Sequence, residues 1–289
     1  VGILNRRRPA LWQLLRSRPW QYDVVHLYDD SRTKLWTRLY GLFKVRLLVT
    51  TQDGYAAFPD RWSRRFAGRF DALGNGSAFL PPSEQIAALA KERGFTCPVH
   101  VHPNGLYCNE MRFVPEAAHA KAVVLGKVEP RKKQEFLAET LRGLPVECDL
   151  IGPLGADTPP DFDGNGANVR RRGEWTRREV CEHLTDYAAL VLLSDGEAHP
   201  LVVIEALAAG CSVVVSEEAS ANLDTALPFV KVVDRGDRAA VAHAIASAVA
   251  GNAAHRAAIR AYAETTFDWS VILPRYQNFI ASLKVSPSP

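Results

Sequence analysis

The segment "VLLSDGEAHPLVVIEALAAGCSVVVS" (191–216) decides the fold class. Its first apolar run ends at Ser194, a loop follows, and Pro200 suits the first turn of a helix that closes at Gly210. A second apolar run begins at Cys211. Because neither run alternates with polar residues, we expect both to be buried on two faces, as in a parallel sheet. The segment predicts a strand–loop–helix–strand unit.

The same alternation continues through residues 117–285, which we predict to form one domain. Apolar runs alternate with helix-like segments, and continuous runs of this kind are typical of a doubly wound α/β domain. The ligand of such a domain lies beyond the carboxyl ends of its strands. The predicted strands are 122–128, 148–152, 169–173, 189–194, 211–216 and 229–234, and the predicted helices lie near 133–142, 176–186, 201–209 and 237–250.

Residues 1–116 show the same rhythm with fewer strands, and we predict a second, shortened Rossmann-like domain there. The turn "PNG" (103–105) and the stretch to Glu116 form the predicted boundary between the two domains. The predicted strands are 22–28, 45–51, 77–83 and 98–103, with helices near 9–17, 32–42, 60–70 and 83–93.

The composition is that of a globular protein, with 47% hydrophobic and 23% charged residues in 289. No apolar run approaches the about 18 residues that cross a bilayer, and no signal-peptide pattern is visible, so we expect a cytoplasmic location. The five cysteines are scattered without a C-x-x-C pair, which favours free thiols over disulfides or a structural zinc site.

Charge is distributed unevenly along the chain. Residues 1–120 hold 17 Lys and Arg against 10 Asp and Glu, whereas the remaining residues hold 18 against 22. A basic first half suits an anionic acceptor or peripheral contact with the inner face of an anionic membrane. The stretch "RRRPALWQLLRSRPWQ" (6–21) could make either contact, or pack on the sheet through Leu11, Leu14 and Leu15. We do not expect nucleic acid, because no recognised binding module is present.

Two glutamates frame the predicted helix at 201–209. Glu197 precedes the helix and Glu205 lies in its second turn, so they do not stack on one helical face. A ligand that touches both must be extended and carry hydroxyl groups, which carboxylates accept well. A nucleotide-sugar meets this description, with its diphosphate near the positive end of the helix dipole.

A basic turn supplies the cations that a diphosphate needs. In "LGKVEPRKKQEFL" (125–137), a predicted strand ends near Gly126 and four cations follow: Lys127, Arg131, Lys132 and Lys133. Lysines at a turn between strand and helix can reach phosphate as point charges. A solvated basic turn is the alternative for this segment taken alone.

Together these motifs resemble glycosyltransferase family 4, whose GT-B fold pairs two facing Rossmann-like domains. The family's E-x7-E signature matches Glu197 to Glu205, and its basic pair after a glycine matches Gly126-Lys127 and Lys132. The remaining matches are "PNGLYCNEMRFVP" (103–115), "IGPLG" (151–155), "NVRRRGEW" (168–175) and "TTFDWSVILPRYQNF" (265–279).

The resemblance implies a retaining enzyme that moves a sugar from a nucleotide-diphosphate donor to an unidentified acceptor, without a metal or a tightly bound cofactor. Lys127 and Lys132 would bind the diphosphate after Gly126, and Glu197 would hold the transferred sugar. The other implied donor contacts are the ribose at Glu205, the base near Glu174 and Trp175, and the backbone at His199, Pro200 and Leu201. A catalytically degenerate nucleotide-sugar-binding or scaffolding protein of the same fold is the alternative.

Several departures from the family pattern bear on activity. Lys127 stands where arginine is commoner, and Gln52 where many relatives have a histidine; whether Asp53 substitutes is open. The strand at 22–28 would be the fourth of the family's first domain, yet only about 20 residues precede it. A residual first strand at "VGIL" (1–4), a natural miniature and a fragment are the three explanations.

Overall fold

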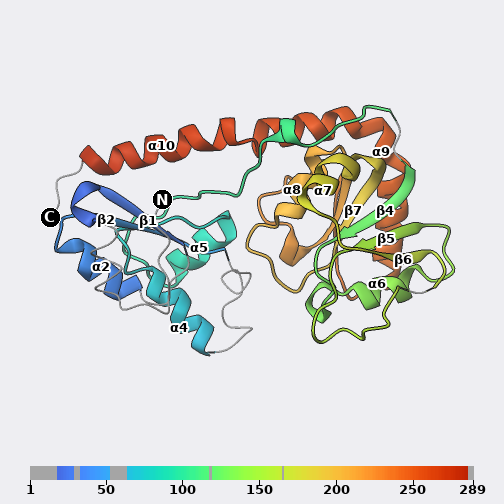
Figure 1. Ribbon diagram of the computed structural model, residues 1–289, viewed down its shortest axis with the longest axis horizontal. Helices are drawn as coiled ribbons and strands as arrows, with labels where there is room; N and C mark the ends of the chain where they lie inside the picture. The colour runs from blue at the N-terminus through green and yellow to red at the C-terminus, as the bar shows by residue number, and fades with distance from the viewer. Residues whose placement is uncertain (1–17, 29–32, 53–63, 117–118, 165, 286–289) are drawn as a thin grey trace. The chain divides into compact units, whose positions relative to one another are not determined.

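The chain forms two compact α/β units (Figure 1), one of Val1–His102 with Pro274–Pro289 and one of Pro103–Leu273. The structure is a computed structural model that describes residues 18–28, 33–52, 64–116, 119–164 and 166–285. Both sheets are parallel, as the buried apolar runs predict.

The second unit holds a six-stranded sheet in the order β6-β5-β4-β7-β8-β9. Every neighbouring pair is parallel, which confirms the predicted doubly wound topology. The strands are β4 (His119–Leu125), β5 (Glu147–Ile151), β6 (Val169–Gly173), β7 (Tyr187–Leu192), β8 (Ser212–Ser216) and β9 (Val230–Val233). Each overlaps one predicted strand.

The helices that connect these strands are α6 (Gln134–Leu141), α7 (Arg177–His183) and α8 (Leu201–Ala208). After β9 come α9 (Arg238–Thr266) and α10 (Trp269–Val285). Short 3-10 turns complete the unit at η3 (Cys108–Glu110), η4 (Pro130–Lys132), η5 (Leu184–Asp186) and η6 (Glu217–Ala219). The end predicted for α9 near residue 250 is wrong. Gly251 does not break the helix, because Asn252 beside it is buried and donates to Gly210 O at 2.9 Å.

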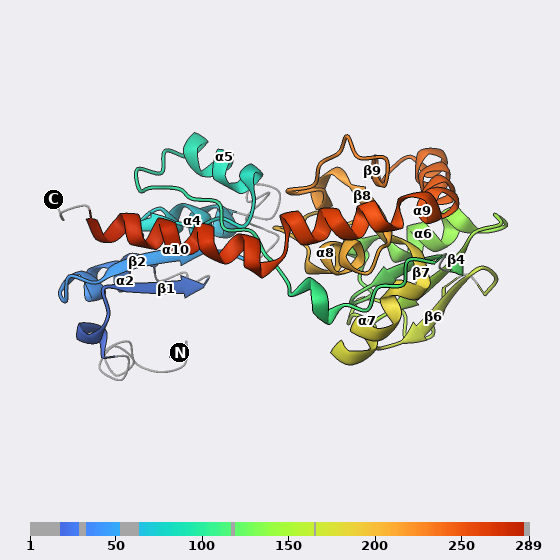
Figure 2. The same cartoon turned by 90° about the horizontal axis from the view of Figure 1, so that it is seen from above.

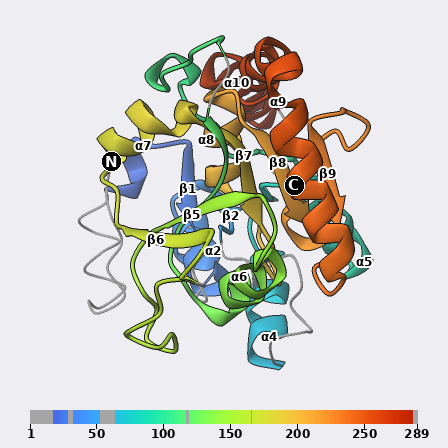
Figure 3. The same cartoon turned by 90° about the vertical axis from the view of Figure 1, so that its right-hand side faces the viewer.

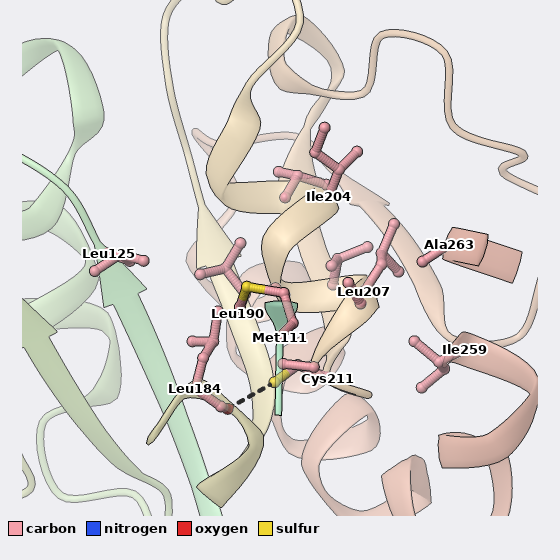
Figure 4. Close-up of a cluster of buried hydrophobic side chains, with 14 of the residues drawn as sticks. Met111, Leu125, Leu184, Leu190, Ile204, Leu207, Cys211, Ile259 and Ala263 are labelled. Atoms are coloured by element: carbon pink, nitrogen blue, oxygen red, sulfur yellow. Dashed lines mark hydrogen bonds between the residues drawn. The ribbon is translucent and has the colours of Figure 1, made fainter. Parts of the chain in front are cut away.

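The two faces of this sheet carry separate apolar cores. Val123 and Leu125 of β4 face α7 and α8, whereas Ala122 and Val124 face α6 and the first half of α9. Figure 3 shows α7 and α8 on one side of the strands and α6 on the other. Figure 4 shows part of the first core, where the Cys211 thiol donates to Leu184 O at 3.2 Å. Helices on both faces leave the ends of the strands as the open edge of the unit.

The segment after the predicted interdomain turn belongs to the second unit. Leu106 and Met111 lie in the core beside α8, and Leu106 exchanges backbone hydrogen bonds with Phe267 and Trp269. The structure therefore divides the chain at residues 102 and 103 rather than at 116 and 117. It also assigns α10 from Pro274 onward to the first unit.

The first unit holds a parallel sheet in the order β1-β2-β3. Its strands are β1 (Val24–Tyr28), β2 (Arg46–Thr50) and β3 (Ala78–Phe79), and its helices are α2 (Thr33–Gly41), α4 (Arg64–Leu73) and α5 (Glu84–Glu92), with a 3-10 turn η1 (Pro19–Gln21). The predicted strand 98–103 is reduced to one bridge between Phe79 and Val99. Pro81 and Pro82 lack the N–H groups that a longer ladder requires. The predicted helix 9–17 lies outside the described residues.

Helix α10 returns to cover this sheet, and Figure 2 shows it over β2. Tyr276 of α10 donates to His26 Nδ1 at 2.9 Å. Thr50 Oγ1 donates its hydrogen to Leu80 O, so it accepts from His26 Nε2 at 2.7 Å. Burial, assisted by the nearby His102, lowers the pKa of His26 to about 4. A neutral imidazole on β1 thus joins Tyr276 of α10 to Thr50 of β2.

Two smaller expectations concern the cysteines and membrane spans. All five cysteines are free, as predicted, and Cys108, Cys148 and Cys211 are buried. Among the helices of the described ranges, none combines the length and the apolar character that a bilayer span requires.

Arg256 has the largest buried polar side chain among the described residues of the second unit. Replacing its guanidinium tests the packing around it. Its guanidinium donates to Thr185 O at 2.7 Å and to Val114 O at 3.0 Å. Arg256→Met leaves these buried carbonyls without donors, so we expect a loss of about 3 kcal/mol in the free energy of unfolding. Chemical denaturation of this variant beside the exposed Arg178→Met provides the measurement. A loss no larger than that of Arg178→Met would contradict the assignment.

Candidate functional site

The order of the strands reverses between β4 and β7, the two central strands of the second unit. The loop 126–133 follows β4 and the loop 193–199 follows β7. Because parallel strands end at the same edge, both loops border the crevice in which doubly wound domains bind ligands. The backbone joins them, since Asp195 N donates to Arg131 O at 2.9 Å.

Gly126 opens the first loop in a conformation that favours glycine, with a φ of 132°. A Cβ atom there would lie 2.8 Å from Lys132 Nζ, which shows that the lysine folds back over this glycine. Gly152 follows β5 with a φ of 148°, and a Cβ on it would lie 2.1 Å from Gly126 O. Both glycines are therefore required for the close approach of backbone and cation.

The four predicted cations of this loop fall into two classes. Arg131 and Lys133 are ion-paired, Lys133 to Asp195 at 3.2 Å. Within the described part of the chain, Lys127 and Lys132 have no carboxylate within ion-pair distance. Two ammonium groups at the switch point thus remain available to an anion.

Glu197 lies in the second loop, where Arg131 Nη1 donates to its Oε1 at 2.9 Å. Its backbone N–H donates to Glu218 O at 3.0 Å, which ties the loop to the end of β8. The side chain is 17% exposed. The structure therefore brings Glu197 to the same crevice as the basic loop, and one of its oxygens is already bound.

An ion network supports the second loop from the side of β9. Arg235 pairs with Asp195 at 2.8 Å and with the nearly buried Glu218. Asp195 also accepts from Lys133, so one carboxylate connects both loops. Such a network fixes loop geometry before any ligand arrives.

Glu205 lies in the second turn of α8, with its side chain 14% exposed, and pairs with Arg177 at the start of α7. Burial raises the pKa of Glu205, and the Arg177 guanidinium opposes that rise. Arg177 comes just after Glu174 and Trp175, the predicted base-contact residues. Glu174 is exposed, whereas Trp175 is half-buried against the core. The structure thus brings the Glu205 and Trp175 regions together through Arg177.

The start of α8 combines an open helix end with a buried histidine. Pro200 caps the helix without a side-chain hydrogen bond, and Leu201 is 48% exposed. The ring of His199 is buried; its Nδ1 accepts from Asn104 N at 3.0 Å and its carbonyl accepts from Asn104 Nδ2 at 2.8 Å. The helix end therefore suits an anion, while the ring and carbonyl of His199 serve the structure.

Some of these partners could not be identified from sequence. The pattern placed Arg131 among four equivalent cations, and nothing in it singles out Arg177 or Asn104 as partners of Glu205 and His199. The Asn-Gly turn that begins at residue 104 is the one sequence signal for Asn104, and it predicts a domain boundary rather than a contact with His199.

Gln52, in the position of the family's histidine, follows β2 and is exposed. Asp53 lies outside the described residues. In the described ranges, no group of three or more His, Cys, Asp or Glu side chains could hold a metal ion.

Comparison of the sequence with family models gives two matches. Residues 4–105 match the model described as "Glycosyl transferase 4-like domain", and residues 116–266 match "Glycosyl transferases group 1". The second match alone spans more than half of the chain. No curated protein matches the sequence. The narrower assignment to family 4 stays a prediction.

Solved glycosyltransferase structures share the fold. Alr3699/HepE from Anabaena, in complex with UDP and glucose, has a TM-score of 0.75 at 15% identity over 95% of this chain and 82% of that chain. Sucrose-phosphate synthase from Thermosynechococcus elongatus has a TM-score of 0.71 at 18% identity over 95% and 77%. The apo lipopolysaccharide outer core galactosyltransferase WaaB gives 0.72 at 15% over 94% and 80%. These likenesses confirm the GT-B fold with two Rossmann-like domains.

His199 makes the stability of the second unit depend on pH. Burial lowers its pKa to about 4, below the ordinary value of 6.5. Between these values the unfolded chain binds the proton more readily, so acid favours unfolding. The stabilisation is complete above pH 6.5, declines as the pH falls and is lost below about 4; it amounts to about 3 kcal/mol.

Hydrogen exchange of the peptides around β7 and α8, measured from pH 7 to 4, tests this expectation within the second unit. His199→Gln keeps an acceptor for Asn104 and removes the titration, so its opening free energy should depend less on pH than that of the wild type. His243→Gln, on an exposed part of α9, is the matched control. Equal slopes for the wild type and His199→Gln would refute the role of His199.

Proposed function

The chain belongs to the glycosyl transferases group 1 family, and from this premise we propose that it transfers a sugar from a UDP-sugar to an acceptor hydroxyl with retention of configuration. The choice of UDP is supported by HepE, whose structures hold UDP with glucose and UDP-glucose. Binding of a nucleotide-sugar donor accords with the open cations and the helix end at the switch point.

The observation that carries the proposal is the pair of ammonium groups of Lys127 and Lys132, which have no carboxylate partner among the described residues and lie beside the Glu197 loop. In the proposed step the bond between the anomeric carbon and the β-phosphate oxygen breaks, and its electron pair leaves with the diphosphate. The acceptor oxygen bonds to the anomeric carbon on the same face, and its proton passes to the departing phosphate oxygen. The two lysines stabilise the charge that develops, a contribution that needs no metal ion.

The remaining residues are proposed to orient the donor. Glu197 accepts hydrogen bonds from sugar hydroxyls, and Glu205 from the ribose. The open N-terminus of α8, at Pro200 and Leu201, faces the phosphate or sugar, and the segment of Glu174 and Trp175 contacts the base. The arrangement supports these roles because each residue lies at a carboxyl end of the parallel strands or on a helix that begins there.

Donor binding is the first test. We expect UDP to bind to the wild type, and Lys127→Ala or Lys132→Ala to weaken binding by about tenfold or more, since each removes a charge-assisted contact to phosphate. Calorimetric titration with UDP and other nucleoside diphosphates gives the affinities and the preferred base. Lys231→Ala on the edge strand β9 is the matched control. Unchanged affinity in both site variants would contradict the proposed diphosphate site.

Turnover separates an enzyme from a degenerate binding protein of the same fold. Incubation with a UDP-sugar panel should release UDP, insensitive to EDTA, and NMR of the product should show the donor's anomeric configuration. Glu197→Ala should reduce turnover about a hundredfold or more while UDP affinity stays near that of the wild type. Tight UDP binding without turnover of any donor would favour the degenerate alternative, and inversion would exclude the retaining step.

A second proposal concerns where the first unit acts: at the cytoplasmic face of a membrane, on an anionic acceptor. Trp20, Leu42 and Phe43 expose apolar surface, Leu42 to 77%, and the rings of Trp20 and Phe43 lie 5.9 Å apart. Arg18 and Lys44 are exposed next to them in the chain. Exposed aromatic and aliphatic groups flanked by cations suit an anionic lipid surface.

Vesicle flotation tests this surface. The wild type should float with vesicles rich in phosphatidylglycerol and not with pure phosphatidylcholine, and added salt should weaken the binding. Leu42→Asp combined with Lys44→Glu should abolish flotation, while Lys231→Ala should not. Equal flotation of the wild type and the double variant would show that this surface is not the membrane contact.

A further inference from the structure

Arg131 joins the two loops of the switch point through several contacts of its guanidinium. Its Nη1 lies 2.8 Å from Ser194 Oγ, 2.6 Å from Gly196 O and 2.9 Å from Glu197 Oε1. Its Nη2 donates to Glu129 Oε1 at 2.8 Å. One guanidinium therefore contacts three residues of the β7 loop and one carboxylate of its own loop.

The backbone of Arg131 reinforces this connection. Its carbonyl accepts from Asp195 N at 2.9 Å, so the residue contacts the β7 loop through both its main chain and its side chain. Arg131 lies in η4, which is followed by Lys133 in a left-handed conformation with a φ of 57°. The turn geometry thus sets the direction from which the guanidinium enters the β7 loop.

These contacts commit one side of the guanidinium to the protein. Nη1, with two hydrogens, lies within hydrogen-bond distance of three acceptors, and Nη2 donates to Glu129. The two carboxylates that flank the group carry more negative charge than it neutralises, which disfavours a phosphate there. Burial would lower the pKa of Arg131, but Glu197 and Glu129 raise it overall, so the group stays charged. Lys127 and Lys132, with no carboxylate partner among the described residues, differ from it in this respect.

The consequence for Glu197 is a fixed carboxylate with one open side. Oε1 is bound by Arg131, whereas no described residue bonds to Oε2. A side chain that is 17% exposed and held at one oxygen can present the other to a ligand without first losing rotamer freedom.

We propose that Arg131 is a positioning residue for sugar transfer: it orients Glu197 and the 194–197 loop towards the donor sugar and does not itself bind the diphosphate. The inference rests on the proposed function. The positioning role requires arginine, because only a planar guanidinium can contact Glu197, Glu129 and the loop carbonyl together. The ammonium group of lysine offers a single point charge.

A double-mutant cycle tests the proposal. Arg131→Ala and Glu197→Ala should each lower kcat by about a hundredfold, and the double variant should be no slower than Glu197→Ala, since the first residue acts through the second. UDP affinity should stay within about threefold of the wild type in Arg131→Ala. Arg131→Lys should recover only part of kcat, and Arg142→Ala, an exposed ion pair outside the site, should retain it fully.

Other results would overturn the inference. If the two losses multiply, Arg131 acts independently of Glu197; if UDP affinity falls in parallel with kcat, Arg131 is a phosphate ligand. Hydrogen exchange without ligand gives a reading that does not depend on activity: peptides covering 194–197 should exchange faster in Arg131→Ala and not in Arg142→Ala. Unchanged exchange would contradict the positioning role, whereas a wild type that binds no UDP would refute the proposed function instead.

Discussion

The parallel pairing of β4 with β7 is the constraint on which the second unit depends. Ala122 opposes Ala189 and Val123 opposes Leu190, so the two strands end at the same edge although 61 residues (126–186), including two other strands, separate them in sequence. The chain leaves this pair in opposite directions along the sheet. Because the connections diverge, the two loops that follow these strands can approach each other at the carboxyl end of the pair, where Asp195 N donates to Arg131 O.

Charged side chains lie at that edge, and they divide into ion-paired residues and cations without a carboxylate partner among the described residues. Arg131, Lys133 and Arg235 meet the carboxylates of Glu197, Asp195 and Glu218, and these pairs hold the loops together. The remaining cations of the turn have no such partner among the described residues. In the proposed reaction, charge fixed in advance where the diphosphate departs stabilises the leaving group, so the protein supplies no nucleophile. The pairs that rigidify the loops also keep the open lysines apart from neighbouring acids.

The sequence predicts the second unit well because inner strands such as β5, β7 and β8 are buried on both faces and therefore appear as continuous apolar runs. It fails where a tertiary contact overrides a local signal. Gly251 is typical of a helix end, but α9 continues past it because the buried Asn252 donates to Gly210 O. In the first unit, Pro81 and Pro82 lie within the predicted strand 77–83 and shorten β3. For the site, residue types and spacing indicate Glu197, Glu205 and the lysines as candidates, and their binding roles stay predictions.

Residue types and spacing do not predict that Arg131 binds Glu197, because adjacent residues of one turn make different contacts. Side chains in a 3-10 turn project about 120° apart, so Arg131 and Lys132 of η4 cannot face the same way. Lys132 folds over Gly126, and Arg131 reaches the loop after β7. Composition counts both residues simply as cations, but the turn directs them differently: Lys132 has no carboxylate partner among the described residues, whereas Arg131 binds Glu197. The different roles proposed for Arg131 and Lys132 therefore follow from the geometry of the three-residue turn η4.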